Sequence, residues 1–249
     1  MDAIRVTVRR GDVVEAVHRV HVRSSAGGGC GENVRCFLRS SLKPVQAIPL
    51  LEGYDDLGDE ELAIACASHQ AEPAQLDAVR ALLRRADASV DDLENGLQEG
   101  RPEGKLGHNC SGKHAGMLAA CRAHGWPLHP YRALEHPLQQ RVASLVGGEC
   151  EVALDGCGVP TFAMPLSRMC EVFLLTPPRV RQAMAARPEL VGGQGADDTG
   201  LMRALPGFYA KRGAEGLLCA SDGEVAWTLK VEDGSSRALR PPSHRARPR

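Results

Sequence analysis

The stretch Ser40-Ser41-Leu42-Lys43-Pro44 places a hydroxyl and an amine three residues apart at the expected start of a helix. Residues three apart share one face of a helix, so the amine of Lys43 is expected to reach the hydroxyl of Ser40. Pro44 suits the first helical turn, where backbone N–H groups have no intrahelical partner, and Ser40 or Ser41 can cap that turn. A serine beside a lysine amine is an activated nucleophile suited to acyl transfer. The alternative is a capping serine followed by a solvated lysine.

Sequence periodicity outside this stretch predicts strands near both ends of the chain. Apolar and polar residues alternate on either side of Arg10-Gly11-Asp12, and the Asp-Gly pair of Ser221-Asp222-Gly223 indicates a second hairpin. A short strand is expected just before Ser40 and another in the middle of the chain. The expected strands are Ile4–Arg9, Val13–Val22, Val34–Leu38, Val152–Leu154, Leu217–Cys219 and Glu224–Val231.

Between these strands the apolar residues recur with helical spacing. The expected helices are Glu60–Ala67, Pro73–Arg85, Lys113–His124, Leu138–Val146 and Ser167–Leu175. Gly125 marks the end of one of them, and the polar segment Ser89–His108, which contains Gly and Pro, is expected to be mostly loop. Strands at both ends with helices between them predict an α+β fold, in which an antiparallel sheet built from both chain ends carries packed helices.

Composition excludes several classes of function. Of 249 residues, 43% are hydrophobic and 24% charged, and 30 Lys and Arg balance 31 Asp and Glu for a net charge of −1. This balance provides no field that would attract nucleic acid or an anionic membrane. No apolar run has transmembrane length, and the first residues do not resemble a signal peptide, so a cytoplasmic location is expected.

The nine cysteines are expected to be reduced thiols, most of them buried. Their number is odd, their spacing is irregular, and no Cys-x-x-Cys pair occurs. This pattern gives no support to a disulfide framework, a zinc finger or a zinc ribbon.

The composition changes at residue 235. Residues 235–249 contain five arginines and three prolines without an acidic residue, so we expect a disordered basic tail after a domain spanning residues 1–234. A basic tail can bind nucleic acid. A solvated terminus or out-of-frame coding is the preferred interpretation.

Seven segments, taken together and in order, resemble the bacterial L-asparaginase II family, the thermolabile rhizobial type with a serine β-lactamase-like fold. They cover most of residues 10–238. The segments are Glu15-Ala16-Val17-His18, Arg39-Ser40-Ser41-Leu42-Lys43-Pro44-Val45-Gln46-Ala47, Ala67-Ser68-His69, Asn109-Cys110-Ser111-Gly112-Lys113-His114-Ala115-Gly116, Asp155-Gly156-Cys157-Gly158-Val159-Pro160, Lys211-Arg212-Gly213-Ala214-Glu215-Gly216 and Lys230-Val231-Glu232-Asp233-Gly234.

The resemblance implies hydrolysis of L-asparagine to L-aspartate and ammonia by a homodimeric enzyme. It also implies two catalytic pairs, Ser40 with Lys43 and Ser68 with Lys230. A side-chain carboxamide is a poor electrophile, so the site needs an activated hydroxyl, a proton for the departing ammonia and donors for an oxyanion. Ser40 is the preferred nucleophile because its lysine lies nearby in the sequence, although the sequence leaves the choice between the serines open.

The resemblance further implies a metal site and a substrate-binding group. Cys110, Lys113 and Cys157 match a zinc site in relatives, formed by two thiolates, an amine and a water, and thiolates suit zinc. Such a zinc ion would tune or position the site rather than activate water. Asp155 is a candidate for binding the substrate α-amino group. Arg39 and His69 are expected neighbours of the substrate, His69 being alternatively a core histidine.

The chain also departs from the family pattern. Ala71 stands where relatives carry glycine, which would create strain if φ is positive there. The segment after Leu93 is shorter than in relatives and lacks a Cys-Gly-Pro-His motif, and the chain ends soon after Lys230. These departures favour, as an alternative, a truncated homologue that binds a metabolite without turnover.

A second alternative is a β-lactamase or penicillin-binding type serine acylase, which also uses Ser-x-x-Lys. That class requires Lys-Thr-Gly on a late strand, where this chain has Lys230-Val231-Glu232. Ser221-Asp222-Gly223 lies too late in the chain to replace the Ser-Asp-Asn element. This alternative is therefore less favoured.

Overall fold

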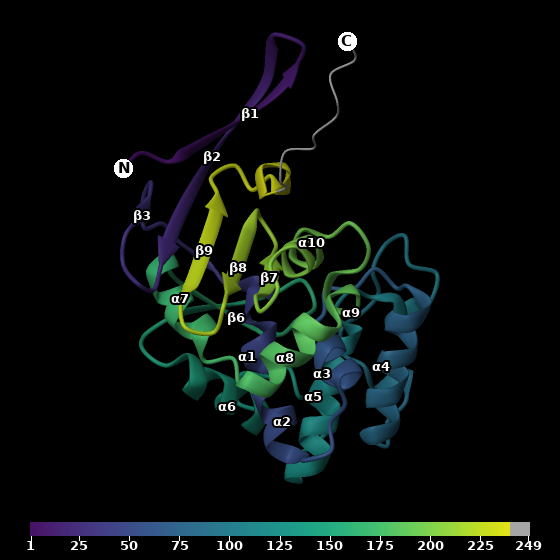
Figure 1. The fold of residues 1–249 in the computed structure, drawn as a ribbon. Coiled ribbons are helices and arrows are strands. Elements are labelled where there is room, and N and C mark those ends of the chain that lie inside the picture. Colours follow the sequence, from purple (N-terminus) through teal and green to yellow (C-terminus); the bar gives the residue numbers. More distant parts are fainter. Residues whose placement is uncertain (240–249) are drawn as a thin grey trace.

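A computed structural model describes residues 1–239 of the chain (Figure 1). Its main feature is an antiparallel six-stranded sheet in which the two ends of the chain meet. The strand order is β1-β2-β9-β8-β7, and β3 pairs with β2 at the side. The strands are β1 (Ile4–Arg10), β2 (Val13–Ser24), β3 (Gly29–Cys30), β7 (Tyr209–Gly213), β8 (Leu217–Ser221) and β9 (Ala226–Val231). The expected sheet built from both chain ends is thus confirmed.

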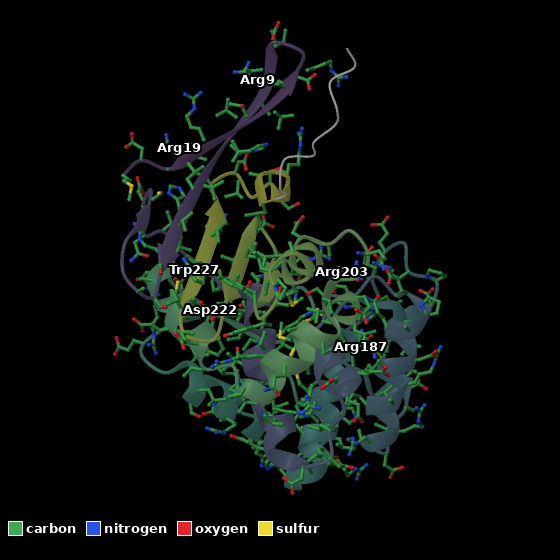
Figure 2. All side chains as sticks on the ribbon, viewed as in Figure 1. Arg9, Arg19, Arg187, Arg203, Asp222 and Trp227 are labelled. Atoms are coloured by element: carbon green, nitrogen blue, oxygen red, sulfur yellow. The ribbon has the colours of Figure 1, made fainter. Side chains whose placement is uncertain are left out.

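Pairing between β2 and β9 joins the ends of the chain. Val20 lies opposite Val231, and Ser24 lies opposite Trp227. Beyond this ladder the β1–β2 hairpin projects away from the rest of the molecule, with the labelled Arg9 and Arg19 side chains on it (Figures 1 and 2). At the opposite edge of the path, β7 pairs only with β8 among the described strands.

A second, three-stranded sheet has the order β4-β6-β5. Its strands are β4 (Arg35–Phe37), β5 (Glu151–Leu154) and β6 (Pro160–Pro165). Sequence periodicity predicted β4 and β5 but not β6, a nearly continuous buried strand between the other two. Because β4 leads directly into residue 39, this small sheet sets the position of the Ser-x-x-Lys stretch.

Helices pack beside and below the main sheet (Figure 1). The α-helices are α1 (Lys43–Gln46), α2 (Ile48–Gly53), α3 (Asp59–Ala65), α4 (Pro73–Arg85), α5 (Ser111–His124), α6 (Pro137–Val146), α7 (Leu166–Leu174), α8 (Pro178–Ala186), α9 (Pro188–Gly192) and α10 (Asp197–Ala204). Helix α7 packs on β9, β8 and β2, while α10 packs on β7. The short 3-10 helices are η1 (Arg39–Leu42), η2 (Val90–Asp92), η3 (Gly104–Gly107) and η4 (Ser236–Leu239).

Local sequence signals explain where the predicted helices begin and end. Helix α4 starts at Pro73, and the Gln75 side chain accepts a hydrogen bond from the backbone N–H of Glu72, a reciprocal cap of the first turn. Helix α5 ends at Gly125, whose φ of 66° is the left-handed conformation that glycine adopts without strain.

The Ser-x-x-Lys stretch forms 3-10 helix η1 followed directly by α1, with Pro44 in the first turn of α1. The expected disordered tail begins at residue 235, but Ser236–Leu239 form η4, and residues 240–249 lie outside the described residues. Within residues 1–239, no helix combines the length and the apolar character that crossing a bilayer requires.

Candidate active site

Lys43 begins helix α1, and its buried side chain packs against the segment that follows α3. Its amine donates hydrogen bonds to the carbonyl oxygen of Ala67 at 2.5 Å and to the hydroxyl of Ser68 at 3.0 Å. A buried amine needs polar partners, and the extended segment after α3 provides both of these. Lys43 therefore meets Ser68. No hydrogen bond between Lys43 and the expected partner Ser40 occurs in the described part of the chain.

Both serines nevertheless open onto one cavity of about 290 Å³ at the edge of β7. The cavity is formed by η1, by the segment after α3 and by the turn between β7 and β8. The residues that line it are Ser40, Ser68, Asn109, Arg212, Gly213, Ala214, Glu215, Gly216, Gly234 and Ser236. We call this cavity the serine pocket.

A second buried lysine lies beside the serine pocket, on β7. The amine of Lys211 lies 3.1 Å from a carboxylate oxygen of Asp198, and both side chains are fully buried. Burial lowers the pKa of Lys211 to about 8; the charge of Asp198 opposes this shift, and those of Lys43 and Arg212 add to it. The Lys211 amine is therefore less basic than that of an exposed lysine. The carbonyl of Lys211 also accepts a hydrogen bond from Ser41 at 2.9 Å, which ties β7 to η1.

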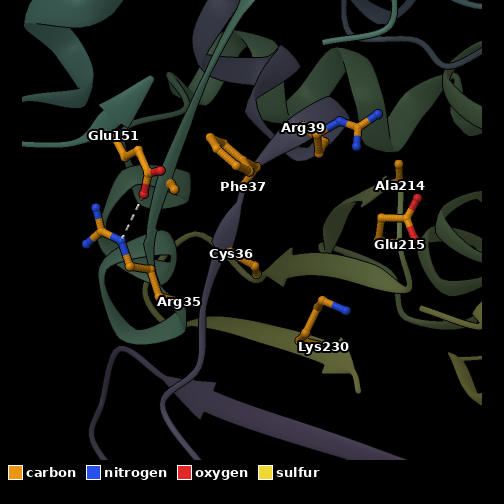
Figure 3. Close-up of a pocket in the computed structure, with 9 residues that line it drawn as sticks. Arg35, Cys36, Phe37, Arg39, Glu151, Ala214, Glu215 and Lys230 are labelled. Carbon is orange, nitrogen blue, oxygen red and sulfur yellow. Dashed lines mark ion pairs between the residues drawn. The ribbon is translucent and has the colours of Figure 1, made fainter. Parts of the chain in front are cut away.

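Lys230, expected to pair with Ser68, lies in a neighbouring cavity of about 400 Å³ (Figure 3). Its amine donates to the carbonyl of Val231 at 2.5 Å. The same cavity is lined by Arg39 and Glu215, and Glu215 also lines the serine pocket. The described residues contain no hydrogen bond between Lys230 and Ser68.

Asp155 forms an ion pair with Arg39 and does not line the serine pocket. Its carboxylate oxygen lies 2.6 Å from Nε of Arg39 and accepts the backbone N–H of Gly156 at 2.8 Å. Burial would raise the pKa of Asp155, but the Gly156 N–H and the charges of Lys113 and Arg39 outweigh it and lower the pKa. Asp155 is therefore an ionised group whose oxygen is already bonded within the protein.

His69 is buried directly behind Ser68. Its Nδ1 accepts the backbone N–H of Ala71 at 3.1 Å, and its Nε2 lies 2.8 Å from the hydroxyl of Ser111. Because Ser111 donates its own proton to the carbonyl of Leu106, Nε2 of His69 carries the hydrogen. Burial, with the charges of Lys43, Arg101 and His108, lowers the pKa of His69 to about 3. The ring is neutral and holds the backbone beside Ser68.

The three expected metal ligands come together behind Lys43. The amine of Lys113 lies 3.0 Å from Sγ of Cys157, and all three side chains are buried. A hydrogen bond to Cys157 and the charges of Lys43 and Lys113 hold the pKa of the Cys110 thiol well below its usual value, although burial opposes them. Burial disfavours the Lys113 ammonium, but the charges of Cys157 and Cys110 outweigh it and raise its pKa.

This group of two thiols and an amine has the donor chemistry that zinc accepts. Lysine must lose its proton to bind a metal, so without an ion the group is stable as an ammonium beside a thiolate. Within residues 1–239, no group of three or more His, Cys, Asp or Glu side chains is arranged to hold a metal ion. Cys110, Lys113 and Cys157 are thus the donor set to consider.

The sequence assigned no individual role to three charged side chains at the serine pocket. Lys211, Arg212 and Glu215 lie within a segment that resembled the family, and the glycines on either side of Ala214-Glu215 indicated a turn. Asp198 carried no signal, because an acidic residue in the first turn of a helix is ordinary. Its complete burial, which makes it a partner for Lys211, is evident only in the folded chain.

A family model described as L-asparaginase II matches residues 6–245 of the chain, a range that includes both serines, all four lysines named above and both thiols. No curated protein matches the chain. Because the match spans nearly the whole sequence, the resemblance of the seven segments is confirmed. The chain therefore belongs to the L-asparaginase II family.

Proposed function

We propose that this protein hydrolyses L-asparagine to L-aspartate and ammonia in the serine pocket. Membership of the L-asparaginase II family suggests asparagine hydrolysis. The observation that carries the proposal is the hydrogen bond of 3.0 Å between the buried Lys43 amine and the Ser68 hydroxyl in the wall of a cavity. A fold of the serine β-lactamase type belongs to the proposal. The sheet built from both chain ends supports it, as does the Ser-x-x-Lys stretch that packs against edge strand β7.

In the proposed reaction, the Ser68 hydroxyl attacks the carboxamide carbon and Lys43, in its neutral form, takes the hydroxyl proton. An ester bond to Ser68 forms, the C–N bond breaks, and the proton from Lys43 leaves with ammonia. Water then hydrolyses the ester, which releases L-aspartate and restores the hydroxyl. Sequence proximity favoured Ser40 as the nucleophile. The contact of Lys43 favours Ser68, and Ser40 is the second hydroxyl of the same pocket.

Edge strand β7 supports oxyanion stabilisation. An edge strand carries backbone N–H groups without a strand partner, and such groups stabilise an oxyanion well when they are fixed in advance. Gly213 and Ala214 line the pocket at this strand end, whereas the backbone N–H of Arg212 is already bonded to the Asp198 carboxylate at 3.1 Å. We place the carbonyl oxygen of the substrate against it.

The proposal includes zinc bound by Cys110, Lys113 and Cys157. When bound, the ion would replace the proton of Lys113 and neutralise the thiolates beside Lys43. The contact of Lys113 with Cys157 at 3.0 Å and the low pKa of the Cys110 thiol support this donor set. The measurement is the metal content of the purified protein by mass spectrometry. About one zinc per chain is expected, and Cys110→Ser should abolish it.

Ammonia release from L-asparagine by the purified protein tests the proposed function. Ser68→Ala and Lys43→Met, an apolar replacement of similar length, should each lower kcat by about a hundredfold to ten-thousandfold because they remove the nucleophile or its base. Lys230→Ala is the matched control, since this lysine lies in the neighbouring cavity, and it should keep activity within about threefold of the original.

The outcomes separate the candidate functions. Ammonia release that survives Ser68→Ala would assign the nucleophile elsewhere, with Ser40→Ala as the next variant. Loss of activity in Lys230→Ala would restore the pair expected from the sequence. A cooperatively folded protein that binds L-aspartate and releases no ammonia would be a binding protein of this family rather than an enzyme.

A further inference from the structure

We infer that Arg212 and Glu215 recognise the α-carboxylate and α-ammonium groups of the substrate, an inference that rests on the proposed hydrolysis of an amino acid amide. Among the residues that line the serine pocket, these two have ionisable side chains, one of each sign. The other lining residues are serines, an asparagine, an alanine and glycines. A pocket with one cation and one anion suits a zwitterion, whose two charges must both be matched when it leaves water.

Glu215 is held in the turn between β7 and β8 in a conformation that disfavours side chains. Its φ is +59°, a left-handed value that costs free energy for any residue other than glycine. A Cβ atom built on Gly234 would lie 2.9 Å from the Glu215 carboxylate oxygen, so the carboxylate lies against Gly234 in the pocket wall. Within residues 1–239, no hydrogen bond or ion pair engages this carboxylate. It is therefore available to a ligand.

The guanidinium of Arg212 is held by two contacts within the protein, one of them to the residue of the proposed nucleophile, Ser68. One guanidinium nitrogen lies 3.4 Å from the carbonyl oxygen of Ser68, and Nε lies 3.9 Å from the buried carboxylate of Asp198. These contacts fix one side of the guanidinium, a group with five N–H donors, and Arg212 lines the serine pocket. The described residues contain no ion pair between Arg212 and Glu215, so neither charge is neutralised by the other.

Asp155, which the sequence resemblance assigned to the α-ammonium, is less available to bind the ammonium group of an amino acid. Its carboxylate is bonded to Arg39 at 2.6 Å and to the N–H of Gly156, and Asp155 does not line the serine pocket. Binding an ammonium there would require breaking the pair with Arg39. Glu215 needs no such rearrangement, and its carboxylate lies in the same pocket as both serines.

The inference assigns a substrate class. The pocket should accept α-amino acids whose side chain places a carboxamide or carboxylate at the serines, with both α-groups charged. Compounds that lack either charge leave Arg212 or Glu215 unmatched and should bind about tenfold or more weakly, the usual effect of losing a charge-assisted hydrogen bond.

Calorimetric titration of the full-length protein with L-aspartate, succinate and β-alanine tests this class. Succinate lacks the ammonium, and β-alanine lacks the α-carboxylate. The original protein should bind L-aspartate at least tenfold more tightly than either analogue. Glu215→Gln should bind L-aspartate no more tightly than the original protein binds succinate, and Arg212→Gln no more tightly than it binds β-alanine.

Matched controls come from the neighbouring cavity, whose wall includes the exposed pair Arg35 and Glu151 at 3.9 Å. Glu151→Gln and Arg35→Gln remove one negative and one positive charge, as the pocket variants do, but on the three-stranded sheet. Both control variants should leave the affinities for all three compounds unchanged. Because Arg212 also contacts Asp198, thermal unfolding of Arg212→Gln accompanies its titration. Arg212→Lys, which keeps the charge, should recover part of the lost affinity.

The inference is overturned if the original protein binds succinate or β-alanine as tightly as L-aspartate, if it fails to bind L-aspartate, or if Glu215→Gln leaves the L-aspartate affinity unchanged. Ammonia release is measured separately on the same preparation. If the protein hydrolyses L-asparagine but binds L-aspartate, succinate and β-alanine with equal affinity, this inference alone is contradicted. Charge-dependent binding without ammonia release would contradict the proposed hydrolysis and leave the recognition of the zwitterion standing.

Discussion

Ala71 has a φ of +61°, a conformation in which a Cβ atom crowds the following carbonyl. The family resemblance implied glycine at this position and strain if φ were positive, and the structure meets that condition. The Ala71 backbone N–H donates to Nδ1 of His69, so the strained residue also fixes the segment behind Ser68. Strain of this kind persists because the surrounding contacts determine the backbone.

Replacing Ala71 by glycine should stabilise the protein by about 1 kcal/mol, because the left-handed conformation costs an alanine about that much. The gain is partly offset by the larger entropy of a glycine in the unfolded chain. The free energy of unfolding in urea measures it. Ala81→Gly, in the middle of helix α4, is the control and should destabilise by about 1 kcal/mol. A loss of stability in Ala71→Gly would show that the strain is absent.

His69 should make stability depend on acid pH. Its native pKa of about 3 lies below its ordinary 6.5, so the unfolded chain binds more protons between these values. Stability is therefore lost as the pH falls from 6.5 toward 3. At pH 4.5 the loss from this one ring is about 2 to 3 kcal/mol.

Urea unfolding of the original protein and of His69→Gln at pH 7 and pH 4.5 isolates this contribution. Gln cannot take up the proton, and its amide can still donate toward Ser111. The variant should lose about 2 to 3 kcal/mol less than the original over this interval, because all other titrating groups are shared. Equal losses in the two proteins would mean that His69 is not held neutral in the native state.

Helices α3 and α5 approach each other more closely at Gly112 than a side chain would allow. A Cβ atom on Gly112 would lie 2.3 Å from the backbone carbonyl oxygen of Ile64, which cannot move aside as a flexible side chain can. This contact places the start of α5, with Cys110 and Lys113, directly behind the end of α3 and hence behind Ser68. The helical spacing of apolar residues predicted α5 but not which helix packs against it.

Gly112→Ala should therefore destabilise the protein by about 1 to 3 kcal/mol, the usual cost of overpacking a core. Gly200 in helix α10 provides the matched control, because a Cβ atom there would meet nothing within 4 Å. Gly200→Ala should stabilise by about 0.5 to 1 kcal/mol through helix propensity. Thermal unfolding followed by circular dichroism compares the two, and a stable Gly112→Ala protein would contradict the close approach.

The predicted elements differ in how strongly their own residues determine them. Helix α4 has the bounds Pro73–Arg85 that the sequence predicted, because a proline and a reciprocal cap define its start. The sequence did not predict β6, since Pro160–Pro165 is a buried run without alternation, whose strand conformation depends on β4 and β5 on either side. The start of α4 was therefore predictable from its own residues, whereas the strand conformation of β6 was not.

At the scale of the molecule, β9 joins the two ends of the chain. It lies between β2 and β8 and pairs with both, so removing it would split the sheet into a β1–β2–β3 part and a β7–β8 part. A chain ending at residue 225 should lose cooperative thermal unfolding. A chain ending at residue 239 retains every described element and should unfold like the full-length protein. A cooperative transition in the shorter chain would show that the N-terminal hairpin and the helical part fold independently of β9.

The sequence by itself predicted many of the elements, although not β6, together with the sheet from both chain ends and the family, because alternation, turn residues, caps and ordered motifs are local properties. Only the tertiary structure decided which groups meet at the site. Lys43 faces Ser68, 25 residues away, rather than Ser40, and Lys211 finds Asp198. A buried amine must form hydrogen bonds with the acceptors that lie near it in the folded protein. Which acceptors lie near it depends on the packing of elements that are far apart in the chain.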